Sequence, residues 1–246
     1  PILAAAAAVA MVTTSGAGLQ ARTVPSPDGE VQLRNVSYVQ EQTVKALSRA
    51  SEYVIYEKTT YSGGYYETWY DKAGQRYRNN TYGSVSIGAV DGTRVVAPDQ
   101  ITPGPIQLLQ SHAVSGPPGD QTIITVDYQR RTWSTDHMTD TPPASAIPDI
   151  TEPETIRQAV KDGTLELLGE ETVDGSLAVH LRIDAVQRGY QVDMWVDAET
   201  FLPIKMTDTV PGEQEPRVTM TYSWLPRTEE NLAHLELTPP PGFDEM

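Results

Sequence analysis

Cysteine is absent from the 246 residues, and its absence excludes several kinds of chemistry at once. Without thiols the chain forms no disulfide, uses no thiolate nucleophile and offers no cysteine-ligated zinc or iron–sulfur site. Basic residues are scarce as well, since 18 Lys and Arg stand against 33 Asp and Glu, for a net charge of −15. A surface this acidic repels phosphate backbones, so we expect no nucleic-acid partner.

Sequence motifs for catalysis and cofactor binding are also missing. No G-x-S-x-G surrounds a serine, and the sequence has neither a P-loop nor a G-x-G-x-x-G. The four histidines are far apart, and only His137, near Asp136 and Asp140, has possible metal ligands close to it in the sequence. A solvated loop explains that group better than a metal site does. We therefore expect no catalytic residue, no metal and no cofactor.

No long hydrophobic stretch is present to cross a bilayer, which takes roughly 20 apolar residues. An uncharged apolar run, PILAAAAAVAMV, occupies only residues 1–12. It fits the apolar region of a signal peptide or the outer end of a transmembrane helix, with an Ala-rich helix inside the fold as the alternative. We predict a signal or transmembrane remnant over residues 1–22, a linker over 23–30 and one domain over 31–246, exported and membrane-associated through its N-terminus.

Helices are few in the predicted domain. Apolar residues spaced three to four apart predict one amphipathic helix over residues 31–50. A second is predicted over residues 151–162, with Thr151 as N-cap, Glu154 completing a capping box and Gly163 ending the helix.

Most of the chain has strand and turn signals. Turns at Gly63-Gly64, residues 71–74, Asp91-Gly92 and Asp174-Gly175 predict successive antiparallel hairpins. Two Pro-rich stretches interrupt them. Residues 98–120 are interpreted as a long excursion with one helical turn near 106–109, and residues 139–150 as a crossing segment.

The last third of the chain alternates strictly between apolar and polar residues, which indicates one buried and one wet sheet face. His180, on the polar side, is interpreted as exposed. The residues predicted to face the apolar side are Val179, Leu181, Ile183, Val192, Met194, Val196, Leu202, Ile204, Met206, Val218, Met220 and Tyr222.

This apolar face must be covered, because each exposed aliphatic side chain would cost about 1.5–3 kcal/mol. Two helices are too narrow to cover a sheet of about ten strands, at roughly 10 Å per helix. We therefore predict an α+β fold: a curled antiparallel sheet, forming an unclosed half-barrel, with two or three helices in its concave face. Such a shape leaves either an apolar ligand cavity, lined by the twelve residues above, or a fully packed core.

Aromatic usage is uneven, with 12 Tyr and 4 Trp but 2 Phe. Tyr and Trp suit positions with one apolar side and one wet end. Tyr56, Tyr66 and Trp69 in the first hairpin are candidates for a cavity rim. Cross-strand pairing within the hairpin is the favoured alternative.

Three segments resemble the LolA-like superfamily, which includes periplasmic lipoprotein carriers, LprG/LppX lipid carriers and RseB/MucB sensors. They are residues 190–206 (YQVDMWVDAETFLPIKM), residues 237–243 (LTPPPGF) and residues 127–133 (DYQRRTW). The Ala-rich start and Pro-rich loops look like actinobacterial, membrane-tethered versions. The resemblance spans residues 31–243 and implies an unclosed barrel with helices as a lid, an apolar cavity and no catalytic residues. The chain departs from the LprG type because it has no lipobox cysteine.

Two functions follow as hypotheses. The first is an extracytoplasmic carrier-like domain that binds a lipid or an acylated lipoprotein. The alternative is a sensor or regulatory ectodomain that reports to a membrane regulatory protein, motivated by the apolar start followed by a linker. An enzyme using scattered carboxylates is a distant third possibility.

Overall fold

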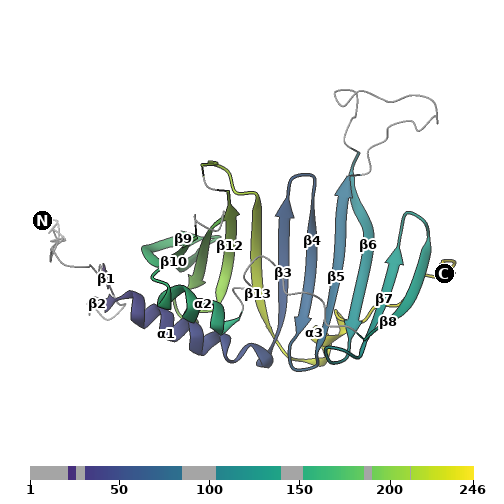
Figure 1. The fold of residues 1–246 in the computed structure, drawn as a ribbon, viewed down its shortest axis with the longest axis horizontal. Coiled ribbons are helices and arrows are strands. Elements are labelled where there is room, and N and C mark those ends of the chain that lie inside the picture. The colour runs from purple at the N-terminus through teal and green to yellow at the C-terminus, as the bar shows by residue number, and fades with distance from the viewer. Residues whose placement is uncertain (1–21, 26–30, 85–103, 140–151, 186–189, 211) are drawn as a thin grey trace, which may run out of the picture.

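A single large sheet dominates the computed structural model, which describes all residues except 1–21, 26–30, 85–103, 140–151, 186–189 and 211 (Figure 1). The sheet has 12 strands in the order β14-β8-β7-β6-β5-β4-β3-β13-β12-β11-β10-β9, and every pairing is antiparallel except that of β14 with β8. Strands β1 and β2 form a separate two-stranded sheet. The predicted curled α+β half-barrel is confirmed, with twelve strands in place of about ten.

The fold contains four helices and fourteen strands in the described residues. The helices are α1 (Val36–Leu47), η1 (Ala50–Glu52), α2 (Pro153–Lys161) and α3 (Glu229–Ala233). The strands are β1 (Arg22–Pro25), β2 (Val31–Arg34), β3 (Tyr53–Tyr61), β4 (Gly64–Asp71), β5 (Arg76–Ser84), β6 (Ile106–Ser115), β7 (Gln121–Asp127), β8 (Thr132–Met138), β9 (Leu165–Val173), β10 (Ser176–Ala185), β11 (Tyr190–Asp197), β12 (Pro203–Thr209), β13 (Val218–Pro226) and β14 (Asp244–Glu245).

The sheet consists of two sequential meanders joined along one strand pair. Strands β3 to β8 form one meander and β9 to β13 the other, and β3 pairs with β13 from Tyr53↔Pro226 to Tyr61↔Val218. The first and last thirds of the chain therefore meet in the middle of the sheet.

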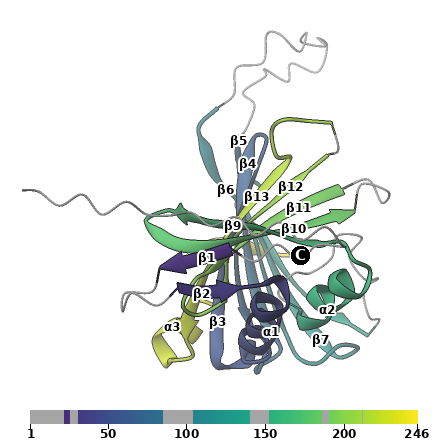
Figure 2. The ribbon, with the colours of Figure 1, turned by 90° about the vertical axis from the view of Figure 1, so that its left-hand side faces the viewer.

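The helices lie on both sides of this sheet. Figure 2 shows α1 and α2 on one side of β3 and α3 on the other. Helices α1 and α2 contact each other, and both contact β9. None of the helices in the described part of the chain is long and apolar enough to span a membrane.

The first predicted helix was placed too early. Residues 31–34 form β2, which pairs with β1. Strand β1 includes residues 23–25, so three residues of the predicted linker also lie in a strand. Helix α1 begins at Val36 because Asn35 is its N-cap, with the Asn35 side chain accepting a hydrogen bond from Tyr38 N at 2.8 Å. Asparagine favours this position because its oxygen satisfies a free backbone N–H of the first turn.

The predicted start of the second helix, α2, was also wrong in detail. Glu152 is the N-cap and makes no side-chain capping bond, so the predicted N-cap was placed one residue too early. Thr151 lies outside the described residues. Pro153 opens the helix, where its missing N–H is not needed. Gly163 follows the helix at φ +67°, which confirms the predicted end.

The predicted excursion over residues 98–120 was wrong for residues 106–115, and with them for the helical turn expected near 106–109. Residues Ile106–Ser115 form β6, a long strand paired with β5 on one side and β7 on the other. The Pro and Gly residues around this stretch suggested a loop, but the strand itself contains neither. Pairing on both sides outweighs the weak local signal.

Several turn predictions are confirmed. The hairpins β3–β4, β4–β5 and β9–β10 turn at the predicted Gly63, residues 71–74 and Asp174-Gly175. Gly64 is required by a close approach, since a Cβ there would lie 2.2 Å from the Tyr82 carbonyl oxygen. The predicted Asp91-Gly92 hairpin and all but the first residue of the 139–150 crossing lie outside the described residues.

Candidate ligand-binding face

The predicted apolar face lies beneath α1 and α2. Eight of its twelve residues belong to the buried core cluster: Val179, Leu181, Ile183, Val192, Met194, Val196, Met206 and Tyr222. Met220 packs against that cluster, and Val218 is partly buried. The face is thus continuous across β10, β11, β12 and β13.

A bulge separates the remaining two predicted residues from this set. The register shifts between Trp195 and Val196, so that Val196 pairs with Pro203 instead of Ile204. Leu202 is buried and Ile204 is half-buried, and both lie outside the core cluster. Strict alternation predicted from sequence fails here because a bulge adds a residue to one strand.

Two helix stripes cover the face. In α1 the buried residues are Val39, Thr43 and Leu47, four residues apart, and in α2 they are Ile156 and Ala159. The apolar members of both stripes belong to the same core cluster as the strand residues. Helix side chains therefore pack directly on the apolar face, for which the sequence left open either a ligand cavity or a packed core.

Thr43 is the polar exception in the α1 stripe. It is fully buried, and its Oγ1 makes no hydrogen bond. A buried hydroxyl without a partner destabilises a fold by about 1–3 kcal/mol. The layer between α1 and the sheet therefore holds an unsatisfied polar group.

Asp208 on β12 is a second polar residue of this face. It pairs directly with Val192 of the core cluster, so its side chain is on the same side of the sheet, and it is 1% exposed. Arg217 forms an ion pair with its Oδ2. Its Oδ1 has no hydrogen-bond partner.

The same face changes character toward β4 and β5. Tyr66 and Tyr77 are exposed there, and the buried Thr68 accepts a hydrogen bond from Asn79 Nδ2 at 2.8 Å. Tyr66 also stacks on Tyr61. The apolar part of the face therefore ends near β3.

The structure divides the three predicted rim residues between the two faces. Tyr56 lies opposite Trp69 across β3 and β4, with ring centroids 5.1 Å apart, and Trp69 stacks on His234, the residue that follows α3. Tyr66 points to the opposite face, because it is an odd number of residues from Trp69. Burial, with Glu67 beside it, raises the pKa of Tyr56. The Tyr56–Trp69 contact is the cross-strand pair favoured by the sequence.

The sequence predicted that His180 is exposed, but in the structure its ring contacts neighbouring side chains. Its Nε2 is 2.8 Å from Asp193 Oδ1 and its Nδ1 is 2.9 Å from Glu171 Oε1, and the ring stacks on Trp195. Arg182 donates to both oxygens of Asp193. Burial alone would raise the pKa of Asp193, but hydrogen bonds from His180 and Arg182 outweigh it and lower the pKa to about 2.

This cluster lies on the face away from α1 and α2, because its strand residues alternate with Leu181, Val192 and Met194. The sequence alone could not identify this cluster, because it is formed by residues on different strands. Asp193 and Arg182 are directly opposite each other once the β10–β11 register is known. Within the described residues, no three His, Asp and Glu side chains form a potential metal site.

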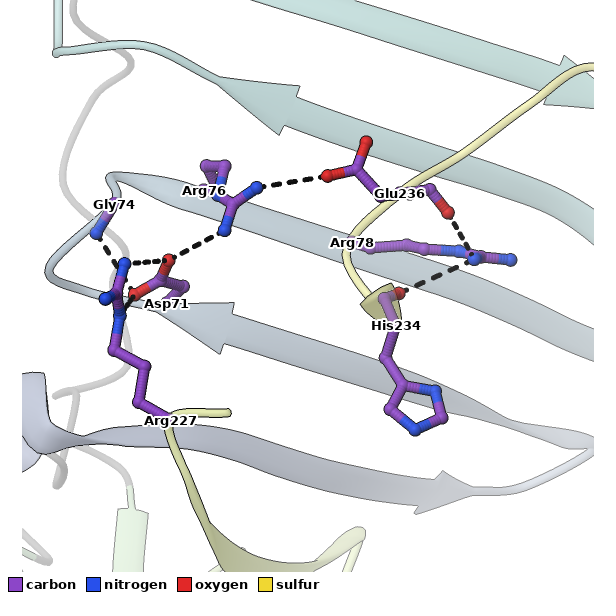
Figure 3. A network of polar contacts seen from close by, with 7 residues as sticks. All are labelled: Asp71, Gly74, Arg76, Arg78, Arg227, His234 and Glu236. Carbon is purple, nitrogen blue, oxygen red and sulfur yellow. Dashed lines mark hydrogen bonds and ion pairs between the residues drawn. The ribbon is translucent and has the colours of Figure 1, made fainter. Parts of the chain in front are cut away.

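A separate polar network fastens the C-terminal segment (Figure 3). Asp71, whose side chain is fully buried, accepts hydrogen bonds from Gly74 N, Arg76 and Arg227. Burial alone would raise the pKa of Asp71, but these bonds outweigh it and lower that pKa. Arg76 also pairs with Glu236, which ties the segment after β13 to the β4–β5 turn.

Comparisons with known proteins add only distant likenesses. No family model and no curated protein matches the sequence. Among solved structures, LprF from Mycobacterium bovis is similar at 14% identity, covering 88% of this chain and 97% of that one, with a TM-score of 0.37. The Pseudomonas aeruginosa MucB in complex with MucA is similar at 14% identity over 81% of this chain and 61% of that chain, with a TM-score of 0.41.

A LolA superfamily protein from Nitrosomonas europaea is similar at 13% identity, covering 76% of this chain and 95% of that one, with a TM-score of 0.21. Likenesses of this degree assign neither a family nor a function. The fold described above rests on the chain's own strand pairing.

Proposed function

We propose that this chain is an extracytoplasmic, non-enzymatic binding domain for a lipid or an acylated lipoprotein. The acyl chain enters between helices α1 and α2 and the sheet. The carrying observation is the continuous apolar face of β10–β13, covered by two helices of only 12 and 9 residues. The resemblance of residues 190–206 to LolA-like carriers leads to the same expectation.

Binding in this proposal is an exchange of contacts. The helices cover the face with Val39, Leu47, Ile156 and Ala159. Exposing the three side chains larger than alanine to water costs roughly 5–9 kcal/mol, at about 1.5–3 kcal/mol each. A chain of about twelve methylenes regains on the order of 10 kcal/mol at ~0.8 kcal/mol per methylene. The two terms are comparable, so an acyl chain is able to replace the helices on the sheet.

Thr43 favours such an exchange. Its unpaired hydroxyl lies between the flanking apolar residues of the α1 stripe and weakens the closed arrangement. When α1 moves away from the sheet, that hydroxyl gains water as a partner. A core built only for stability would use an apolar residue at this position.

The test compares two substitutions that remove the same two methyl groups. Val39→Ala weakens the α1 stripe, while Val54→Ala acts on an equally buried residue of β3 that lies outside the core cluster beneath the helices. Fluorescence titration with N-phenyl-1-naphthylamine measures the affinity for an apolar probe. We expect Val39→Ala to bind the probe about three- to tenfold more tightly than the wild type, and Val54→Ala to bind it as the wild type does.

Mass spectrometry of an organic extract of the purified protein provides an independent readout, with acyl species expected. The proposal fails if the wild type and both variants leave the probe unbound and the extract contains no acyl species. Equal gains in affinity for the two variants would also contradict it, since general loosening would then explain binding.

The regulatory alternative depends on residues 1–30, of which the structure describes only β1. It remains a prediction. A cytoplasmic region encoded before the apolar run would favour the sensor, and a short basic start followed by cleavage would favour the carrier.

A further inference from the structure

Asp208 differs from the other buried aspartates of the described residues, Asp71 and Asp193. Both oxygens of Asp71 accept hydrogen bonds from Arg227, and further bonds come from Gly74 and Arg76. Both oxygens of Asp193 accept bonds from Arg182. Asp208 is as deeply buried, yet its Oδ1 has no partner.

The position of Asp208 places this oxygen at the proposed binding face. On one side it lies opposite Val192, which in turn lies opposite Ile183, and on the other side it lies opposite Val218. On this face of the sheet, the Asp208 carboxylate therefore lies in a row whose other members are aliphatic side chains. A buried carboxylate oxygen without a hydrogen bond is costly, so its presence here points to a partner that arrives with the ligand.

The ion pair with Arg217 decides what kind of partner fits. Because Arg217 already compensates the charge at Oδ2, Oδ1 needs a hydrogen-bond donor and does not need a second cation. An ionised fatty acid offers only acceptors and would add a like charge. A hydroxyl group offers the donor at no cost in charge.

We propose that Asp208 anchors the polar end of the ligand and selects amphiphiles whose headgroup carries a hydroxyl donor. This inference rests on the proposed function, because it places the headgroup beside the face that takes the acyl chain. Asp208 is thus assigned as a specificity-determining residue, with Oδ1 as the accepting atom.

The experiment compares two uncharged ligands of equal chain length, dodecan-1-ol and dodecyl methyl ether, in displacing N-phenyl-1-naphthylamine. The alcohol has a donor and the ether has none. We expect the wild type to prefer the alcohol about tenfold, as one charge-assisted hydrogen bond allows. Asp208→Leu should bind the two ligands within a factor of two of each other.

Asp193→Asn is the matched control, since Asp193 is buried on the other face and should leave the preference unchanged. If Asp208→Leu does not fold, Asp208→Asn replaces it. Its neutral amide oxygen is a weaker acceptor, so the preference should fall to about threefold or less.

Failure of the proposed function and failure of the Asp208 anchor give different results. If neither ligand displaces the probe from the wild type and the probe itself does not bind, the proposed function fails. If both ligands displace it equally well, or if the Asp208 variants keep the tenfold preference, the donor-selective anchor is refuted while the lipid-binding proposal stands.

Discussion

Replacing Thr43 by valine is expected to stabilise the protein. The substitution keeps the β-branched shape and exchanges a fully buried hydroxyl without a hydrogen bond for a methyl group. Removing the unsatisfied group should recover about 1–3 kcal/mol of unfolding free energy. For a domain of this size, each kcal/mol raises the melting temperature by roughly 2–4 °C.

Thr68 provides the opposite case within the same molecule. It is also buried, but its Oγ1 accepts a hydrogen bond from Asn79 Nδ2 at 2.8 Å. Thr68→Val removes that acceptor and should destabilise the protein by about 1 kcal/mol. The two variants make the same chemical change, so their difference isolates the hydrogen bond.

Urea denaturation followed by circular dichroism measures both effects, with the slope of the transition checked for constancy. The urea midpoint should rise for Thr43→Val and fall for Thr68→Val. If Thr43→Val lowers stability, the Thr43 hydroxyl is satisfied in solution and the interpretation of the α1 layer is wrong. If both variants raise stability, the difference between Thr43 and Thr68 does not come from the hydrogen bond.

Three further changes test other parts of the structure. Asp193, with its pKa lowered to about 2, contributes stability that is fully present above its ordinary pKa near 4 and is lost as the pH falls toward 2. Asp193→Asn should therefore lower the free energy of unfolding by about 2 kcal/mol at pH 7 and by little at pH 2, as thermal melts at the two pH values would show. Asp71→Ala should cost about 3 kcal/mol and speed proteolysis after β13; unchanged cleavage there would count against the fastening role. Gly64→Ala should lower the melting temperature by several degrees, since its Cβ would meet the Tyr82 carbonyl, and a neutral result would show that β5 shifts freely.

Strict alternation made the C-terminal strands predictable from sequence. Residues such as Leu181, Val192 and Met194 face the core as expected, because a period of two leaves only one register that buries them. The Asp174-Gly175 turn was equally clear, since its residues suit positive φ. These features depend only on neighbouring residues.

Features that depend on distant partners could not be predicted in this way. Strand β6 has mixed polarity and owes its conformation to β5 and β7 on its two sides. His180 carried no local sign that Glu171 and Asp193 would bracket it, since that requires the registers of both β9 and β11. The bulge that diverts Ile204 is likewise a property of two paired strands.

Pairing of β3 with β13 has a consequence for how the chain reaches its native state. Tyr53 and Pro226 are 226 − 53 = 173 positions apart, so the central pair forms only after almost the whole chain is available. Closing so long a loop is slow, because its entropy is lost before the contacts form. A chain that ends before Val218 would leave the adjoining sides of β3 and β12 open in the middle of the molecule, and such open strands recruit other chains.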